Sequence, residues 1–231
     1  MSASRPNRPA PAAVAAITAT TAMRVAAELR RRILAGDFAP GQRLKIDEIA
    51  QACGVSHMPV RDALRQLEGE GVLESSPHRG ALVKGVDERF VRDFYDLRAA
   101  VEGMLAERCA ETIDEAGLAA LEAAVARFES VAGRGAEAAV AANRALHDLV
   151  NAVADNREAL AVLDRGRVLG DALRVRFGYG AGRIESILRE HRALLRAIAR
   201  RDAAKAGEVA RAHCRRARDD LLAKLAAPPR R

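Results

Sequence analysis

The chain has 231 residues, more than one average domain, so its length favours a small domain joined to a larger one. Apolar residues make up 49% and charged residues 30%, a balance typical of a globular chain, and no apolar run reaches the roughly 20 residues that cross a bilayer. Aromatic residues make up only 3%, without Trp. A core of Ala, Leu, Val and Ile favours helices and argues against an all-β sandwich.

The net charge is +7, and 34 of the 38 basic residues are Arg. Arg suits phosphate and base recognition because its planar guanidinium bonds two acceptors at once, although a codon bias gives the same excess. Cys53, Cys109 and Cys214 lie far apart and form no CxxC pair, which favours free thiols in a reducing cytoplasm. Residues 1–21 show no cleavable signal pattern, and we expect them to form a flexible tail.

Residues 22–85 follow a recognisable order of elements. Helical spacing of apolar residues and the positions of Gly and Pro predict helices over 22–34, 48–52 and 56–70, then strands over 72–75 and 81–84 around a Pro/Gly turn. Asp47 and Ser56 can cap the second and third helices. Three helices followed by a hairpin predict a winged helix-turn-helix.

Three segments carry a family resemblance: GDFAPGQRL, GVSHMPVRDALRQLEGEGVLE and HRGALV. Their order and spacing resemble the DNA-binding domain of the GntR family of bacterial transcription regulators. The resemblance implies binding to double-stranded DNA as a homodimer on an inverted repeat, which suits the small footprint of one such domain.

In a helix-turn-helix, side chains at the start of the recognition helix meet base edges, while hydroxyls and further Arg hold phosphates. The expected DNA contacts are Ser56, His57, Met58, Pro59, Arg61 and Arg65 in this helix and His78, Arg79 and Gly80 in the wing. As an alternative, Arg61 and Arg65 pair with Asp62 and Glu68 on a solvated face.

His57 departs from the family, whose members more often carry Arg at this place. Neutral imidazole makes one bond and cannot clamp a guanine from both sides. We therefore expect an altered operator preference.

After Gly85 the apolar spacing is helical to the end, so residues 86–231 are predicted to form an antiparallel all-α bundle. The predicted helices are 88–112, 115–132, 137–154, 157–176, 182–200 and 203–226. This half resembles the ligand-binding domain of the FadR branch, the type called FCD.

His147, His191 and His213 each fall on the apolar stripe of their predicted helix. One such histidine is usually a core residue, but three on three helices favour a common site. Asn143 lies one turn before His147, so an oxygen and three imidazoles form a set typical of Zn, Ni, Fe or Mn.

The FCD resemblance implies the same divalent metal site from Asn143, His147, His191 in Glu190-His191-Arg192, and His213. Three neutral imidazoles and a neutral amide leave the charge of the ion uncompensated. The pocket should therefore attract an anion, in agreement with the small organic acids that the family senses.

Arg98 lies on the inward stripe of the first bundle helix, where an unpaired guanidinium is costly. Either Glu102 pairs with it or it binds an acidic ligand, and an Arg four residues before a Glu recurs in the family.

The leading hypothesis is a cytoplasmic transcription regulator, a repressor, whose operator binding responds to a small carboxylic acid at the metal site. One alternative is a metal-dependent hydrolase or hydratase. The absence of a general-base motif near the histidines argues against this alternative. The other is a DNA-binding protein whose histidines only stabilise the bundle.

Overall fold

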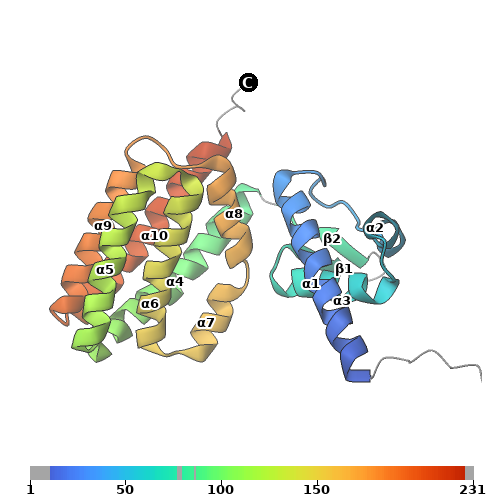
Figure 1. Cartoon of the computed structure of the whole chain (residues 1–231). Coiled ribbons are helices and arrows are strands. Elements are labelled where there is room, and N and C mark those ends of the chain that lie inside the picture. Colours follow the sequence, from blue (N-terminus) through green and yellow to red (C-terminus); the bar gives the residue numbers. More distant parts are fainter. Residues whose placement is uncertain (1–10, 77–79, 86, 227–231) are drawn as a thin grey trace, which may run out of the picture. The chain divides into compact units, whose positions relative to one another are not determined.

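The structure, a computed structural model, describes residues 11–76, 80–85 and 87–226 (Figure 1). The chain divides into two compact units, Met1–Lys84 and Gly85–Arg231. Residues 1–10 of the predicted tail lie outside the described residues. Among the helices described, none is both long and apolar enough to pass through a bilayer.

The first unit holds three helices and a hairpin: α1 (Pro11–Ala35), α2 (Ile46–Cys53), α3 (His57–Gly69), β1 (Leu73–Ser76) and β2 (Gly80–Val83). Leu29, Val60 and Leu67 are almost fully buried in its core. The guanidinium of Arg30 on α1 donates two hydrogen bonds to Glu70 at the end of α3, at 2.8 and 2.6 Å. These contacts hold α3 in place so that its opposite side faces solvent.

Two details of this unit differ from the sequence prediction. Helix α1 begins at Pro11, within the expected tail, because Pro suits the first helical position and the Ala-rich stretch after it contains no further Pro or Gly. Helix α2 begins at Ile46 after the N-cap residue Lys45. Asp47 therefore lies in the first turn and is not the cap.

The second unit is an antiparallel bundle of α4 (Glu88–Thr112), α5 (Glu115–Val131), α6 (Ala136–Ala154), α7 (Arg157–Asp164), α8 (Arg167–Phe177), α9 (Arg183–Ala199) and α10 (Ala203–Ala226), with the short 3₁₀ helix η1 (Ala132–Arg134). Helix α4 packs along α10, and α5 packs against both α6 and α9. Leu105, Leu146 and Ile198 are buried between these helices. Polar groups in this core are therefore held by packing from several sides.

The predicted helix over 157–176 is two helices. The chain breaks at Gly166, whose φ of 83° is left-handed and favours glycine. Helix α8 then lies close to α4, since a Cβ added at Gly170 would lie 2.8 Å from the Phe94 ring. The break gives α8 its own direction beside the histidine-bearing helices.

Candidate functional site

His147 on α6, His191 on α9 and His213 on α10 come together inside the bundle. Each side chain is buried, and one ring nitrogen of each lies within 4.8 Å of the corresponding atoms of the other two. Their ring centroids are 5.1 to 5.8 Å apart. Three residues separated widely in sequence thus form one compact cluster of nitrogen donors.

Two of the rings are oriented by carboxylates. Nδ1 of His213 lies 2.7 Å from Oε2 of Glu190, and Nδ1 of His147 lies 3.3 Å from Oε2 of Glu102. A carboxylate next to one ring nitrogen favours a proton on that nitrogen, so the other nitrogen keeps its lone pair free. Histidines that bind a metal usually donate their other ring N–H to a carboxylate in this way. The two carboxylates thus prepare Nε2 of each ring to act as a ligand.

The third histidine has a different neighbour. Nε2 of His191 lies 3.1 Å from Oδ1 of Asn143, and its Nδ1 is buried without a hydrogen-bond partner in the described part of the chain. A separation of about 3 Å suits a hydrogen bond, and it equally suits two adjacent ligands of one ion with bonds of about 2.1 Å. The donor set of three imidazoles and one amide oxygen therefore fits a divalent transition metal.

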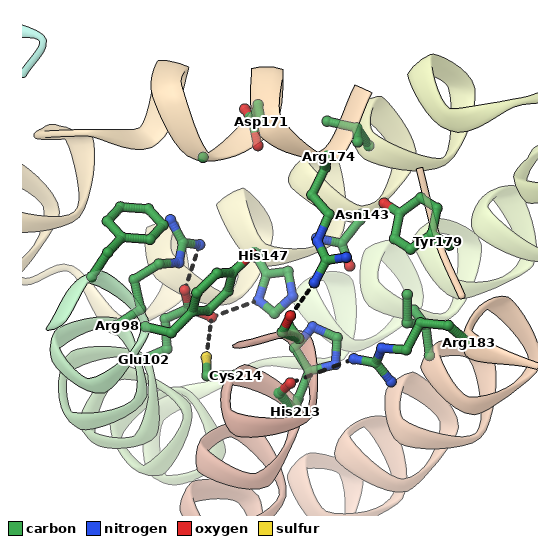
Figure 2. A pocket seen from close by; sticks show the side chains of 16 residues that line it. Arg98, Glu102, Asn143, His147, Asp171, Arg174, Tyr179, Arg183, His213 and Cys214 are labelled. Atoms are coloured by element: carbon green, nitrogen blue, oxygen red, sulfur yellow. Dashed lines mark hydrogen bonds and ion pairs between the residues drawn. The ribbon is translucent and has the colours of Figure 1, made fainter. Parts of the chain in front are cut away.

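Each carboxylate at the cluster also has an arginine. Nη2 of Arg98 lies 2.5 Å from Oε1 of Glu102 as an ion pair, although not aligned as a hydrogen bond, and Nη1 of Arg183 donates to Oε1 of Glu190 at 2.8 Å. Figure 2 shows the Arg98–Glu102 pair on one side of His147 and the side chain of Arg183 on the other. The carboxylates thus add no net negative charge to the cluster, and the charge of a bound cation would stay available to an anion.

The protonation of the site follows from burial and from these pairs. Burial lowers the pKa of His147 to about 4 and that of His191 well below its ordinary value. Burial alone would raise the pKa of Glu190, but hydrogen bonds from His213 and Arg183 lower it to about 2. At neutral pH the site holds neutral His147 and His191 next to an ionised Glu190, which is the form that metal binding needs.

A cavity of about 60 Å³ opens beside His147 and His213, and Arg98 and Asn143 also line it (Figure 2). His191 does not border this cavity; it is almost fully buried, and its ring lies nearly perpendicular to that of Phe128, with the ring centroids 4.8 Å apart. Of the two roles that the sequence left open for Arg98, the pair with Glu102 is present. Arg98 also borders the cavity, and its binding of an acidic ligand stays a prediction.

Sequence reasoning missed several residues of the site. Glu190 belonged to a segment noted for His191, but its carboxylate contacts His213, and only the packing of α9 on α10 reveals this. Arg174 on α8 is also buried at the cavity, where it donates to Oδ2 of Asp220 at 2.5 Å and to the carbonyl of Ala217. The signal that could have found Arg174 is its place on the buried stripe of α8.

In the first unit, the start of α3 presents a row of exposed side chains: Ser56, His57, Met58, Arg61 and Arg65. Ser56 is the N-cap residue but makes no side-chain cap hydrogen bond, so its hydroxyl is available to a phosphate. Pro59 is buried, so it does not belong to this exposed row, and its expected contact with DNA stays untested. Arg65 lies 3.5 Å from Asp62 in an exposed, weak pair.

His57 and Gly80 are further described residues among the expected DNA contacts. Nε2 of His57 lies 3.2 Å from Oδ1 of Asp47, and both side chains are exposed. His78 and Arg79 lie outside the described residues, while Gly80 has a φ of 74° that favours glycine. Sequence reasoning did not single out Arg43, which is exposed, bridges to Leu82 of β2 and lies next to Gly80.

Two family models match the chain. The model described as bacterial regulatory proteins of the gntR family matches residues 21–83. The FCD domain model matches residues 93–216, more than half of the chain. Each match falls within one of the two compact units.

Curated relatives are transcription regulators. The chain is 28% identical to the HTH-type transcriptional regulator YdhC of Bacillus subtilis over 188 residues, which cover 80% of this chain and 84% of that protein. It is 27% identical to the HTH-type transcriptional repressor RspR of Escherichia coli over 175 residues, with coverages of 75% and 77%. The gluconate operon transcriptional repressor of Bacillus subtilis is 39% identical, but over only 90 residues, 39% of this chain and 37% of that one.

Solved structures share the fold. McbR/YncC of Escherichia coli has a TM-score of 0.67 at 18% identity, covering 89% of this chain and 98% of that chain. A GntR family member from Pseudomonas syringae pv. tomato has a TM-score of 0.53 at 25% identity, with coverages of 95% and 89%. The likeness extends over both units of the chain.

Proposed function

The chain belongs to the GntR family of bacterial regulatory proteins and carries an FCD domain, and from this premise we propose that it is a repressor released from its operator by a small carboxylic acid. As a member of this family it is a DNA-binding transcription regulator and not an enzyme. The hydrolase or hydratase alternative is therefore discarded. Histidines with a purely structural role remain as an outcome of the experiment below.

One observation carries the sensing proposal. The three buried histidines adjoin a cavity that Arg98 also lines, and the carboxylates of the site are balanced by arginines. A purely structural cluster gains nothing from converging lone pairs, because buried polar atoms without partners cost free energy. A cation held by the cluster and an anion held by Arg98 would satisfy these groups together.

Asn143, His147, His191 and His213 are the proposed metal ligands. The metal, one of Zn, Ni, Fe or Mn, would supply positive charge and an open coordination position for a carboxylate. Glu190 and Glu102 orient the imidazoles, and their own arginines keep them ionised. Arg98 would donate hydrogen bonds to the acid, so that binding depends on both the cation and the guanidinium.

On the DNA side, we propose that Ser56, His57, Met58, Arg61 and Arg65 enter or flank the major groove. Arg79, His78 and Gly80 of the wing would add contacts to the backbone or minor groove. One winged unit makes a small interface, so we propose a homodimer on an inverted repeat, acting in the cytoplasm.

Coupling between acid and DNA would run through α4. Arg98 and Glu102 lie on this helix, which begins at Glu88, directly after the DNA-binding unit in the chain. An acid that binds more tightly when α4 is in one position shifts the population toward that conformation. The shift is set by the difference between its affinities for the two conformations. The two DNA-binding units of a dimer must contact two half-sites at once, so a small change in the distance between these units weakens operator binding.

The experiment has two parts, on full-length protein purified without a His-tag. Metal analysis before and after chelation should find about one divalent ion per chain, lost in His213→Ala. An operator duplex selected from random DNA should then be released by short carboxylic acids from metal-loaded protein but not from chelated protein. Arg98→Ala should abolish release, while the matched control Arg92→Ala, at an exposed position on the same helix, should not.

Two results would overturn the proposal separately. Protein that never retains a metal would make the histidines structural. Metal-loaded protein that stays on the operator with every acid tested would remove the sensing role while leaving the metal site.

A further inference from the structure

Met58 is an exposed apolar side chain at the start of α3. It is the second residue of this helix and is 58% exposed, more than the other large apolar side chains that the structure describes. Single exposed apolar residues are common on protein surfaces and by themselves indicate nothing. Met58 differs in its place, because its exposed neighbours on α3 include the polar residues Ser56, His57 and Arg61 that are expected to contact DNA. An apolar group in this row needs a partner of a different chemistry from theirs.

The helical register of α3 places Met58 in line with two exposed arginines. Arg61 and Arg65 follow it by three and seven residues, so the three side chains share one face of the helix. Val60 and Leu64 lie on the other side of α3 and are buried in the core of the first unit. A duplex that Arg61 and Arg65 contact is therefore within reach of Met58 as well.

The chemistry of the side chain decides which base Met58 can recognise. A thioether carries no donor and is only a weak acceptor, so it cannot read the hydrogen-bonding pattern of a base edge. The apolar group that base pairs present in the major groove is the C5-methyl group of thymine. Contact between the two removes apolar surface from water on both sides, and the flexible methionine chain can adapt to the position of the methyl group. Thymine is therefore the base that suits this residue.

The sugar–phosphate backbone suits Met58 less well. Contacts with phosphates are made by charged side chains, hydroxyl groups and N–H donors, which Ser56, Arg61 and Arg65 supply in the same row. A phosphate covered by Met58 would lose water without gaining a hydrogen bond, which costs free energy. A base edge in the groove is therefore the better partner.

Helix geometry gives the approximate position of this thymine. An α-helix rises about 1.5 Å per residue, so Met58 lies about 4.5 Å from Arg61 along the axis of α3. Successive base pairs of a duplex are about 3.4 Å apart. The thymine should therefore lie within about two base pairs of the base that Arg61 contacts.

We propose that Met58 is a specificity-determining residue that reads the C5-methyl group of a thymine in the operator. The inference rests on the proposed function, in which the exposed start of α3 enters the major groove, and it adds a base and a position. Met58 would select a base by apolar contact, next to the hydrogen bonds that Arg61 can make.

Uracil lacks only the methyl group of thymine, which makes it the probe. An operator duplex selected from random DNA with the full-length protein is synthesised again with each thymine of one half-site replaced in turn by deoxyuridine. In fluorescence anisotropy, one replacement should weaken binding about fourfold, as the loss of one buried methyl group would. This replacement should lie within about two base pairs of the position at which Arg61→Ala relaxes the sequence preference.

Variants link the methyl effect to Met58. Met58→Ala should bind the thymine and deoxyuridine duplexes equally, while Met58→Leu keeps an apolar end and should retain a preference for thymine. Met23→Ala is the matched control, because Met23 is a methionine of similar exposure, 57%, on α1, and it should behave as the wild type. Position 58 is exposed, so these substitutions should cost little stability, which thermal unfolding checks.

A gain of binding tests the same contact in the other direction. The thymine–adenine pair found with deoxyuridine is replaced by a cytosine–guanine pair, with and without a methyl group on C5 of the cytosine. The wild type should bind the methylated duplex about fourfold more tightly than the unmethylated one. Met58→Ala should bind both alike.

The outcomes separate this inference from the proposed function. Equal binding of every deoxyuridine duplex by the wild type overturns the role of Met58, and so does a methyl effect that Met58→Ala retains. In both cases, weaker and less selective binding by Arg61→Ala still upholds the DNA contact of α3. If neither Arg61→Ala nor Met58→Ala changes operator binding, the proposed DNA contact of α3 itself fails.

Discussion

The carboxylate of Glu190 lies 2.7 Å from Nδ1 of His213 and also accepts a hydrogen bond from Arg183 at 2.8 Å. One residue of α9 thereby orients a histidine of α10, while the next residue, His191, points its own ring into the cluster. Two adjacent residues on one helix thus serve two different imidazoles of the proposed site.

This relationship predicts the effect of Glu190→Gln. The amide keeps the size of the side chain but loses the negative charge that holds the proton on Nδ1 of His213, so metal affinity should fall about 10- to 100-fold. Competition with a chromogenic chelator measures the change. Glu185→Gln, at an exposed position of the same helix, is the control, and equal affinities for the two variants would contradict an orienting role.

The buried histidines predict how the stability of the metal-free protein depends on pH. The folded pKa of His147 is lowered from 6.5 to about 4, and that of His191 is lowered as well. The unfolded chain binds more protons below pH 6.5, so stability should fall as pH decreases from 6.5 toward 4, by up to about 1.4 kcal/mol per pH unit for each histidine.

Urea unfolding of chelated protein at pH 7.5, 6 and 5 measures this slope. Glu190 contributes in a separate window, because its pKa is lowered to about 2 and its stabilisation is lost only as the pH falls from 4.5 toward 2. His147→Gln should show a smaller slope than the wild type. Identical slopes would mean that His147 is not buried as a neutral ring.

Close contact between α4 and α8 predicts the effect of Gly170→Ala. The added Cβ would lie 2.8 Å from the ring of Phe94, and such overpacking costs about 1–3 kcal/mol of stability, partly offset by the better helix propensity of Ala. The double variant with Phe94→Leu supplies the control. Thermal unfolding should show that the cost of Gly170→Ala shrinks when Phe94 is absent; additive effects would point to another cause.

The positions of Arg43 and Arg61 predict that the two residues contribute to DNA binding in different ways. Arg61→Ala should weaken binding to a selected operator by about 1–3 kcal/mol and relax sequence preference, as the loss of a base contact does. Arg43→Ala, next to the wing, should weaken binding to all duplexes and reduce the salt slope by about one. Fluorescence anisotropy at several salt concentrations separates the two, with Arg189→Ala, exposed on α9, as control.

His57→Arg should strengthen operator binding and steepen its dependence on salt. His57 is exposed and lies 3.2 Å from Asp47, so a longer cation in its place could reach a phosphate and release a counterion. The same anisotropy titrations measure this. Unchanged affinity at two salt concentrations would show that position 57 stays away from the DNA.

The sequence by itself determined the family, the two kinds of domain and the stripe positions of the three histidines. Helical periodicity places His147, His191 and His213 on the apolar faces of their helices, since that face must be buried. It also predicted the winged helix-turn-helix, because turn residues and apolar spacing are local signals. The start of α1 at Pro11 and the break at Gly166 also have local causes, an Ala-rich sequence and a glycine. The sequence prediction nevertheless placed neither of them correctly.

Only the tertiary structure decided which charged groups meet at the site. The contacts of Glu190 with His213, Glu102 with His147, and Arg174 with Asp220 join different helices across 23 to 46 positions. Periodicity tells which face of a helix is buried but not which neighbour covers it. Helix packing therefore gives the site its paired charges and the cavity beside His147 and His213.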